Sequence, residues 1–454
     1  MIPPFDIAAD LDTPVSAYLK LGSLEPRFLL ESVERGQRIG RYSFIGFGQG
    51  ANHVLSHENF AQNRPGDVLE CLRRALAHAP KLAPVIPDLP FSGGLVGVAS
   101  FDMVNQFERL PVSKRVDPEL PLAAYYAPPS LLVFDHVTRR AALLHHGTDE
   151  ERQGLREQVV ACLKGPAGTP GSSPGNHQAP EASMTKEEFV AAVEKTKKYI
   201  RSGDVYQLVL SIRFSGKHSL SPFQIYRALR LLNPSPYMYF LQFGQLSVVG
   251  SSPEALVSLK DNVVSLRPIA GTRPRCEDPH ADLEQEKHLL ADPKERAEHV
   301  MLVDLARNDL GRVATAGSVT VDPYFSVERY SHVMHLVSGV AGELEQTKDA
   351  YDAFAAAFPA GTLVGAPKVR AMELIHEMEP HGRGFYAGTA GYFGHGGNMD
   401  QAIAIRTLVF NGDQYSFQAG AGIVADSDPE KEYEEVLAKS QILRQALDMA
   451  EAGL

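Results

Sequence analysis

Residues 418–439 limit the fold of this chain most strongly, because they join a glycine-rich segment to a helix with a marked start. An apolar alternation that ends at Arg406 precedes them at hairpin distance and is typical of a strand. Asp428 followed by Pro429 signals a helix start, since aspartate caps free N–H groups and proline fits the first turn. The sequence therefore predicts a strand, a glycine-rich turn and an acidic helix. Helical spacing puts three charged side chains on one face of that helix: Glu432, Glu435 and Lys439.

A second helix with the same start signal is predicted from Asp292 and Pro293. Glu298 lies beside its apolar stripe, at nearly the same distance from the cap as Glu435 lies from its own, so the two glutamates can face each other. Proteins commonly hold Mg²⁺ through one or two carboxylates and leave the other positions to water and substrate. The pair predicts a magnesium site, and a solvated charged face is the alternative for either helix alone. The stripe is predicted from four apolar positions: Ala297, Val300, Met301 and Leu305.

The formal net charge of -11 restricts the partners of this 454-residue chain. An acidic balance does not suit a general nucleic-acid or anionic-membrane surface, so an anionic ligand needs a local cluster of basic and N–H groups. No apolar run reaches the length of a membrane-spanning helix. Three widely spaced cysteines predict no disulfide framework, and the aspartate-rich start lacks the pattern of a secretory signal. We expect a cytoplasmic protein with no nucleic-acid and no membrane partner.

Residues 164–183 are dense in Pro, Gly and Ser and predict a flexible linker. They divide the chain into an N-terminal segment, 1–163, and a C-terminal segment, 184–454, which begins with a capping box at Thr185. Predicted strands in the C-terminal segment alternate with only a few long helices. This order favours an α+β fold of antiparallel sheets flanked by helices over a doubly wound parallel sheet.

Residues 267–275 place three arginines around a Gly-Thr turn, which predicts either an anion cradle or a solvated basic loop. Three other functional motifs are not supported by the sequence. The glycine spacing in residues 361–368 does not fit a phosphate-binding loop. His332 and His335 have no further Cys or His at zinc-ligand spacing, and the chain has no Gly-x-Ser-x-Gly elbow.

Seven short segments together resemble the chorismate-utilising enzymes, and within that family the large subunits of anthranilate synthases, known as component I. The resemblance extends over essentially the whole chain. It implies orthogonally packed antiparallel sheets with helices outside, and a Mg²⁺-dependent lyase reaction of chorismate with ammonia that gives anthranilate and pyruvate. The segments are residues 29–32, 268–272, 302–309, 329–335, 358–362, 365–368 and 418–422.

The resemblance also assigns roles by position. The Mg²⁺ ligands fall on Glu298 and Glu435, the pair that helix spacing had already brought together. Glu254 corresponds to the acid that protonates the leaving C4 hydroxyl, a role that requires burial to raise its pKa. His335 corresponds to a residue associated with pyruvate elimination, and a structural core histidine is the alternative. The positions that hold the substrate correspond to Gly271, Thr272, Tyr386, Arg406, Gly420, Ala421, Gly422 and Lys439.

Two residues distinguish the reactions within the family. Gln207 lies where the water-adding isochorismate and salicylate synthases carry a lysine base, and a neutral amide cannot deprotonate water. Ala270 lies where members with a covalent intermediate carry a lysine, so direct attack of ammonia at C2 is favoured. The alternatives are aminodeoxychorismate synthase component I, which aminates C4, and a non-catalytic amino-acid sensor with the same fold.

The resemblance further implies that 1–163 is a regulatory domain and 184–454 a chorismate-binding catalytic domain, and it implies a partner. In anthranilate synthases the end product tryptophan binds between two segments that correspond here to Ser32 and to Pro236, Tyr237 and Met238, which predicts feedback inhibition. No cysteine lies in the Gly-x-Cys-x-Gly pattern of a glutamine amidotransferase domain. We therefore expect ammonia from solution or from a separate component II subunit, in a heterotetramer.

Overall fold

The computed structural model describes residues 4–33, 40–58, 67–110, 119–166, 175–329 and 333–454. Residues 167–174 of the predicted linker and His332 fall outside these ranges, as does a turn that the sequence predicts at Arg35 and Gly36. None of the helices in these ranges is long and apolar enough to cross a bilayer.

The larger sheet, 12-stranded among the described residues, runs through the molecule in the order β1-β8-β7-β3-β2-β11-β12-β23-β24-β10-β20, with β9 also on β10. All its neighbouring pairs are antiparallel. The strands are β1 (Ile7–Ala8), β2 (Pro26–Glu31), β3 (Tyr42–Phe47), β7 (Ser130–Asp135), β8 (Arg140–His145), β9 (Glu181–Ala182), β10 (Gln207–Lys217), β11 (Tyr237–Phe243), β12 (Leu246–Ser252), β20 (Gly365–Ala366), β23 (Thr407–Asn411) and β24 (Gln414–Ile423).

The second sheet, nine-stranded over the same ranges, runs in the order β16-β19-β14-β13-β22-β21-β5-β6-β4, and a three-stranded sheet has the order β15-β18-β17. The strands of the second sheet are β4 (Ala51–Leu55), β5 (Gly94–Ala99), β6 (Ala123–Ala127), β13 (Ala255–Lys260), β14 (Val263–Leu266), β16 (Thr320–Val321), β19 (Val340–Glu343), β21 (Thr389–Gly394) and β22 (Met399–Ile403). Those of the third are β15 (Ile269–Pro274), β17 (Ser326–Arg329) and β18 (Val333–Val337).

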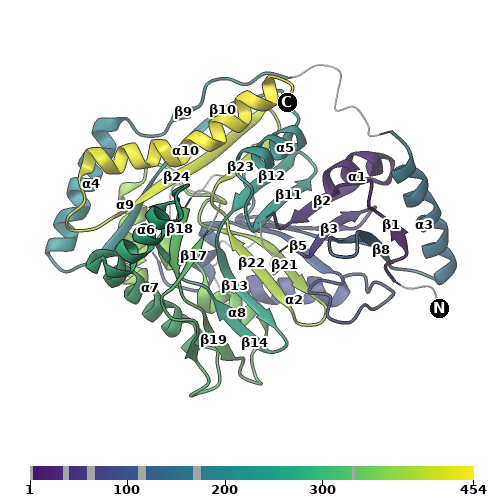
Figure 1. The fold of residues 1–454 in the computed structure, drawn as a ribbon, viewed down its shortest axis with the longest axis horizontal. Coiled ribbons are helices and arrows are strands. Elements are labelled where there is room, and N and C mark those ends of the chain that lie inside the picture. The colour runs from purple at the N-terminus through teal and green to yellow at the C-terminus, as the bar shows by residue number, and fades with distance from the viewer. Residues whose placement is uncertain (1–3, 34–39, 59–66, 111–118, 167–174, 330–332) are drawn as a thin grey trace.

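Helices cover the outside of the sheets (Figure 1). The predicted start signals form as N-caps, with Asp292, Asp428 and Thr185 accepting hydrogen bonds from the first turns of their helices. Thr148 caps the helix of residues 149–164 in the same way. The helices are α1 (Pro14–Lys20), α2 (Asp67–His78), α3 (Asp149–Lys164), α4 (Lys186–Arg201), α5 (Pro222–Leu232), α6 (Pro279–Ala291), α7 (Pro293–Gly311), α8 (Ala350–Ala357), α9 (Lys368–Met378) and α10 (Pro429–Glu451), with 3₁₀ turns η1 (Leu21–Leu24), η3 (Phe101–Gln106) and η4 (Gly361–Leu363).

The core lies between the sheets and these helices. Helix α10 lies along β24 and buries Val436 and Leu443 in the same apolar core as Leu210 and Ile423 (Figure 1). The predicted α+β class of packed antiparallel sheets flanked by helices is confirmed.

Both large sheets take strands from either side of the linker region. Strand β2 of the N-terminal segment pairs with β11 of the C-terminal segment, and β5 pairs with β21. The division of the chain at 164–183 into two domains stays a prediction.

Two local predictions are wrong. The glycine-rich residues 418–422 form the C-terminal half of β24 and not a turn, since the ladder with β10 runs without a break from Leu208↔Ile423 to Lys217↔Gln414. On α7 the predicted apolar stripe is displaced, because Val300 is 39% exposed while His299 and Leu302 are buried. The buried face lies one to two residues further along the helix, where the sheets contact it.

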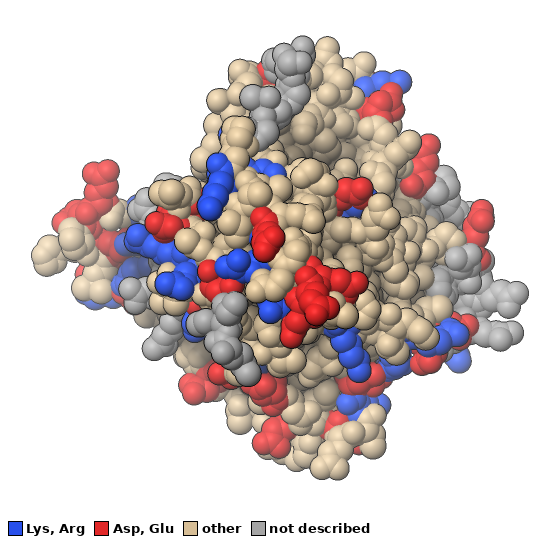
Figure 2. All heavy atoms as spheres, turned by 90° about the vertical axis from the view of Figure 1, so that its right-hand side faces the viewer, with Lys and Arg blue, Asp and Glu red and all other residues tan. Residues whose placement is uncertain are grey.

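Figure 2 shows one face of the molecule, on which Lys and Arg side chains alternate with Asp and Glu. On the described part of this face, neither sign of charge forms a continuous surface. This face therefore offers no extended basic surface, and the local basic cluster for an anionic ligand stays a prediction.

Candidate active site

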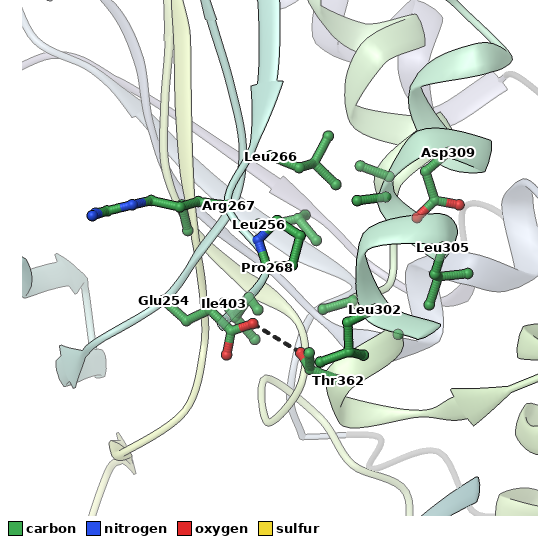
Figure 3. A pocket seen from close by; sticks show the side chains of 15 residues that line it. Glu254, Leu256, Leu266, Arg267, Pro268, Leu302, Leu305, Asp309, Thr362 and Ile403 are labelled. Carbon is green, nitrogen blue, oxygen red and sulfur yellow. Dashed lines mark hydrogen bonds between the residues drawn. The ribbon is translucent and has the colours of Figure 1, made fainter. Parts of the chain in front are cut away.

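Glu254 lies between β12 and β13, and its carboxyl group points towards η4 (Figure 3). The Thr362 hydroxyl donates a hydrogen bond of 3.0 Å to Glu254 Oε1. Burial raises the pKa of Glu254 to about 7, although the hydrogen bond from Thr362 and the charge of Arg406 act in the opposite direction. A carboxyl group with this pKa is partly protonated near neutral pH, as a proton donor must be. The burial that the predicted acid requires is therefore present.

Thr362 is a site residue that the sequence analysis missed. It lies 108 positions from Glu254 and reaches it from η4. A possible signal was its place at the end of residues 358–362, one of the segments that carried the resemblance. Apolar side chains surround this pair and line a pocket between the sheet and α7, including Leu256, Leu302 and Leu305 (Figure 3).

Arg406 occupies the crossover where the chain leaves β22 in the second sheet and enters β23 in the larger one. The apolar alternation around it was predicted as one strand, and it is instead two strands in two sheets. Arg406 has a φ of 49° and its carbonyl accepts a hydrogen bond of 3.1 Å from Ser251 N. The side chain is exposed, and among the described residues no carboxylate forms an ion pair with it. Its charge acts on both Glu254 and His335.

His335 lies on β18, next to the strand that carries Gly271 and Thr272. Its Nδ1 donates to the Gly271 carbonyl over 2.8 Å and lies 3.1 Å from the Thr272 hydroxyl. Burial lowers the pKa of His335, and the neighbouring Arg406 lowers it further. The imidazole is therefore held neutral with its lone pair on Nε2.

Gly271 forms a bulge in β15. The register against β18 shifts between Ala270 and Thr272, and Gly271 has a φ of +64°. A Cβ added there would lie 2.9 Å from the Leu289 side chain, so the position needs glycine on both counts.

The glycine-rich part of β24 faces Tyr386 and Gln207. A Cβ on Gly420 would lie 2.7 Å from the Tyr386 hydroxyl and 2.7 Å from the Leu210 carbonyl, and a Cβ on Gly422 would lie 2.7 Å from Gln207 Nε2. The side chain of Ala421 is fully buried in the core, so only its backbone can contact a ligand.

The charged side chains of α7 and α10 gather beside these glycines. Lys439 Nζ donates to the Gly420 carbonyl over 3.0 Å and forms an ion pair of 2.6 Å with Glu435. Burial raises the pKa of Glu298, and the negative charges of Glu295 and Glu435 raise it further. Glu298 therefore lies close enough to Glu435 to interact with it, as the helix spacing predicted, while its role as a metal ligand stays a prediction.

The segment that carries the three arginines of residues 267–275 is mostly strand β15 and not a solvated loop. Each guanidinium is paired with a carboxylate: Arg267 with Glu328, Arg273 with Asp292 and Glu295, and Arg275 with Asp282. The solvated loop is therefore wrong, and the anion cradle stays a prediction.

The residues predicted to bind tryptophan lie together at the β2–β11 pair. Met238 is the register partner of Glu31, and Val33 N donates to the Ser235 carbonyl over 3.1 Å. The Ser32 hydroxyl is buried and has no hydrogen-bond partner among the described residues. Tyr237, which follows Pro236 in the chain, donates a hydrogen bond of 3.1 Å to Asp400.

A sequence model of the family described as chorismate binding enzyme matches residues 25–445. The chain belongs to this family.

Its relatives in the chorismate binding enzyme family include proteins named anthranilate synthase component 1. That of Thermus thermophilus is 46% identical over 453 residues, covering 98% of this chain and 97% of the relative, and that of Streptomyces coelicolor is 45% identical, covering 98% and 88%. The solved structure of anthranilate synthase component I from Streptococcus pneumoniae superposes with a TM-score of 0.78 at 35% identity, covering 90% of this chain and 95% of that one. The menaquinone-specific isochorismate synthase of Escherichia coli, at 21% identity and a TM-score of 0.71, shares the fold, over 95% of this chain and 91% of its own.

Proposed function

We propose that this chain is the ammonia-using component of an anthranilate synthase. It would convert chorismate and ammonia to anthranilate, pyruvate and water, in the first step of tryptophan biosynthesis. Its near full-length similarity to proteins of that name supports the reaction. The observation that carries the proposal is the raised pKa of the buried Glu254, with Arg406 close enough to act on both Glu254 and His335. Positions 207 and 270 carry Gln and Ala, not lysine.

Substrate binding rests on groups that oppose the charge of a dicarboxylate. Arg406 offers a planar guanidinium with a fork of N–H donors, which suits a carboxylate. Gly420 and Gly422 let a ligand approach the backbone closely, and Lys439 adds a positive charge held at Gly420. Tyr386 and Thr272 add hydroxyl groups at the border of the same site. These groups would hold the two carboxylates of chorismate and orient the ring.

The first chemical step is amination. Ammonia attacks C2, the ring double bonds shift, and the C4 hydroxyl leaves as water after it takes a proton from Glu254. Thr362 donates to Oε1, which leaves Oε2 to carry the transferred proton. Burial in this mostly apolar pocket raises the pKa of the carboxyl to about 7, so that part of it carries a proton near neutral pH.

The second step is loss of pyruvate. A base removes the proton from C2, the enolpyruvyl ether bond breaks, and the ring becomes aromatic. A neutral His335 with its lone pair on Nε2 suits this role, because its Nδ1 is held by the Gly271 carbonyl.

The residues present fit a magnesium ion. Glu298 and Glu435 offer hard oxygen donors from two helices, in a site where carboxylates repel one another. Few protein ligands of this kind, completed by water and substrate, are typical of Mg²⁺. When bound, the ion would neutralise one substrate carboxylate.

Regulation and assembly complete the proposal. Tryptophan would inhibit by binding at Ser32, Pro236, Tyr237 and Met238, where a buried hydroxyl lacks a partner among the described residues. A glutamine amidotransferase subunit, component II, would supply ammonia in a heterotetramer. The three cysteines form no disulfide, which suits a cytoplasmic enzyme.

The test is to incubate the purified chain with chorismate, Mg²⁺ and an ammonium salt at mildly alkaline pH and to follow anthranilate fluorescence. The expected result is anthranilate that disappears with a chelator and is suppressed by tryptophan. A non-fluorescent 4-amino product would assign the chain to the aminodeoxychorismate reaction, and chorismate binding without turnover would favour the sensor. If Ser32→Ala and Met238→Thr both leave tryptophan inhibition unchanged, the tryptophan site is wrongly placed.

A further inference from the structure

A buried ion pair, Arg383 with Glu379, lies behind the candidate active site. Both residues are 4% exposed. The guanidinium forks onto the carboxylate, with Nε donating to Glu379 Oε2 over 2.9 Å and Nη2 to Oε1 over 2.7 Å. A second buried carboxylate, Asp102 of η3, also acts on Arg383. A bidentate pair of this kind is rigid, since two parallel hydrogen bonds fix both planes.

Part of its role is to complete the edge of β10. The neighbouring strand β20 is only two residues long, and its pairing with β10 reaches no further than Leu208 of β10. Beyond that point Ser211 donates from its backbone N over 2.9 Å and from its hydroxyl over 2.7 Å to Glu379, and Arg383 Nη2 donates to the Val209 carbonyl over 3.0 Å. The pair thus satisfies backbone groups that a longer strand would have paired.

The contacts of the pair extend further than that edge needs. Arg383 Nη1 donates to the Leu363 carbonyl over 2.6 Å, and Leu363 is the residue after Thr362 in η4. The Arg383 carbonyl accepts from Tyr386 N over 3.0 Å, and the guanidinium lies 5.6 Å from the centre of the Tyr386 ring. Ser211 is the register partner of Gly420. The ion pair therefore contacts Tyr386 directly, and it bonds to the chain neighbour of Thr362 and to the register partner of Gly420.

We propose that Arg383 and Glu379 form a positioning unit for the reaction, which holds Thr362 in hydrogen-bonding reach of Glu254 and Tyr386 against Gly420. The unit touches no substrate and acts only through these three residues. An effect of this unit on the reaction rests on the proposed function. Its effect on the Thr362–Glu254 hydrogen bond does not depend on that function.

Arg383→Lys is the variant that separates this role from a simple contribution to stability. A lysine keeps the positive charge next to Glu379, but its single ammonium cannot reach Glu379, Val209 and Leu363 with a fixed fork. Thr362 then loses its support, and the hydrogen bond that lowers the pKa of Glu254 weakens. The pKa of Glu254 should rise, while loss of stability alone would leave it unchanged. Arg406, whose charge also acts on Glu254, is not altered.

The experiment is an infrared titration of the Glu254 carboxyl in the full chain, obtained as the difference between each protein and its Glu254→Gln counterpart. The expected result is a higher titration midpoint in Arg383→Lys than in the unaltered chain. Arg41→Lys is the control for breaking a bidentate arginine–carboxylate pair as such. Arg41 precedes β3, pairs with Asp135 at a more exposed position, and contacts no residue of the site. An unchanged midpoint in folded Arg383→Lys would overturn the proposal.

A double-variant comparison tests whether Arg383 acts on Glu254 through Thr362. Thr362→Val removes the donor directly, so Arg383→Lys should cause no further shift of the midpoint in that background, and an additional shift of equal size would overturn the proposal. Glu379→Gln is the second variant if Arg383→Lys does not fold, because it keeps an oxygen for Ser211 while weakening the fork, and the same upward shift is expected.

Activity supplies an independent readout. With anthranilate formation in the unaltered chain as reference, Arg383→Lys should lower kcat by up to about 100-fold, the scale of a small misplacement of catalytic groups, with a smaller change in KM for chorismate. If the unaltered chain makes no anthranilate but the infrared midpoint still moves, the proposed function fails and the positioning of Thr362 stands. A kcat that falls only with the folded fraction would overturn the catalytic part.

Discussion

Glu254 can donate a proton only in its protonated form, so the residues that surround it set the pH range of the reaction. Its pKa is raised to about 7 by burial. A raised carboxyl pKa means that the acid form is present below this value and is lost as the pH rises through it. The chorismate carboxylates would raise the pKa further in the complex, because negative charge nearby favours the neutral form.

The first prediction concerns this acid. With free ammonia held constant, kcat/KM should fall as the pH rises above about 7, where free Glu254 loses its proton. Glu254→Gln should lower kcat by about 10²–10⁴-fold, the usual contribution of a positioned acid. The residual rate of Glu254→Gln, measured in a stopped assay of anthranilate, should not show this decrease with rising pH. The same decrease in Glu254→Gln would assign the titration to another group.

The second prediction uses two glycines of one strand. Gly420→Ala should abolish chorismate binding, because the new methyl group meets a backbone carbonyl that cannot move and the Tyr386 hydroxyl, each at 2.7 Å. Gly422→Ala meets only the end of the Gln207 side chain at that distance, which can rotate away, and should weaken binding much less. Calorimetric titration with chorismate measures both. Unchanged binding in Gly420→Ala would show that the β24 backbone does not contact the substrate there.

Single residues were predictable where one local signal defined them. Helix spacing alone paired Glu298 with Glu435, because a cap fixes the phase of everything that follows it. Thr362 was not predictable in this way, since its partner lies 108 positions away and their contact depends on how η4 meets β12 and β13. The pairing of Arg267, Arg273 and Arg275 with carboxylates could not be predicted either, because it too depends on how separate elements pack.

At the level of elements, the helix starts are the part of the sequence that local chemistry determines best. Asp292 and Asp428 cap α7 and α10, the two helices that carry the glutamate pair. Strands were harder, because glycines in residues 418–422 are equally compatible with a turn. What makes this segment a strand is the ladder with β10, a long-range contact that no local pattern contains.

The third prediction tests one cap. Asp428 accepts hydrogen bonds of 3.0 Å from Glu430 N and 3.3 Å from Lys431 N. Asp428→Ala should reduce the free energy of unfolding by about 1 kcal/mol, a typical value for loss of a side-chain cap. Asp428→Asn should stay close to the unaltered chain, since asparagine caps equally well. Urea unfolding of the three proteins measures the difference, and equal losses in both variants would point to the charge of Asp428 instead of its cap.

For the molecule as a whole, the fold class followed from the order of strands and helices, but the way the two segments combine did not. The composition of residues 164–183 indicates a boundary, and nothing local indicates that β2 pairs with β11 or β5 with β21 across it. Sheets assembled from distant parts of the chain are specified by complementary edges and faces, which appear only in three dimensions.

The fourth prediction follows from these shared sheets. Residues 184–454 expressed alone should fail to fold stably, because β11 and β21 would each lose a strand neighbour and expose an edge. A full chain with a protease site inserted within 164–183 should stay assembled after cleavage and unfold in one transition. Circular dichroism during urea unfolding and size-exclusion chromatography are the measurements. Two separate transitions in the cleaved protein would support independent domains.

The buried Ser32 hydroxyl and Tyr237 at the β2–β11 pair also have a spectroscopic consequence. The chain contains 16 tyrosines and no tryptophan, so its intrinsic emission arises from phenol side chains. An indole bound beside Tyr237 would be the sole indole in the complex and would accept excitation energy from the surrounding tyrosines. Occupancy of the inhibitor site could then be followed by sensitised indole emission, without a label and without turnover.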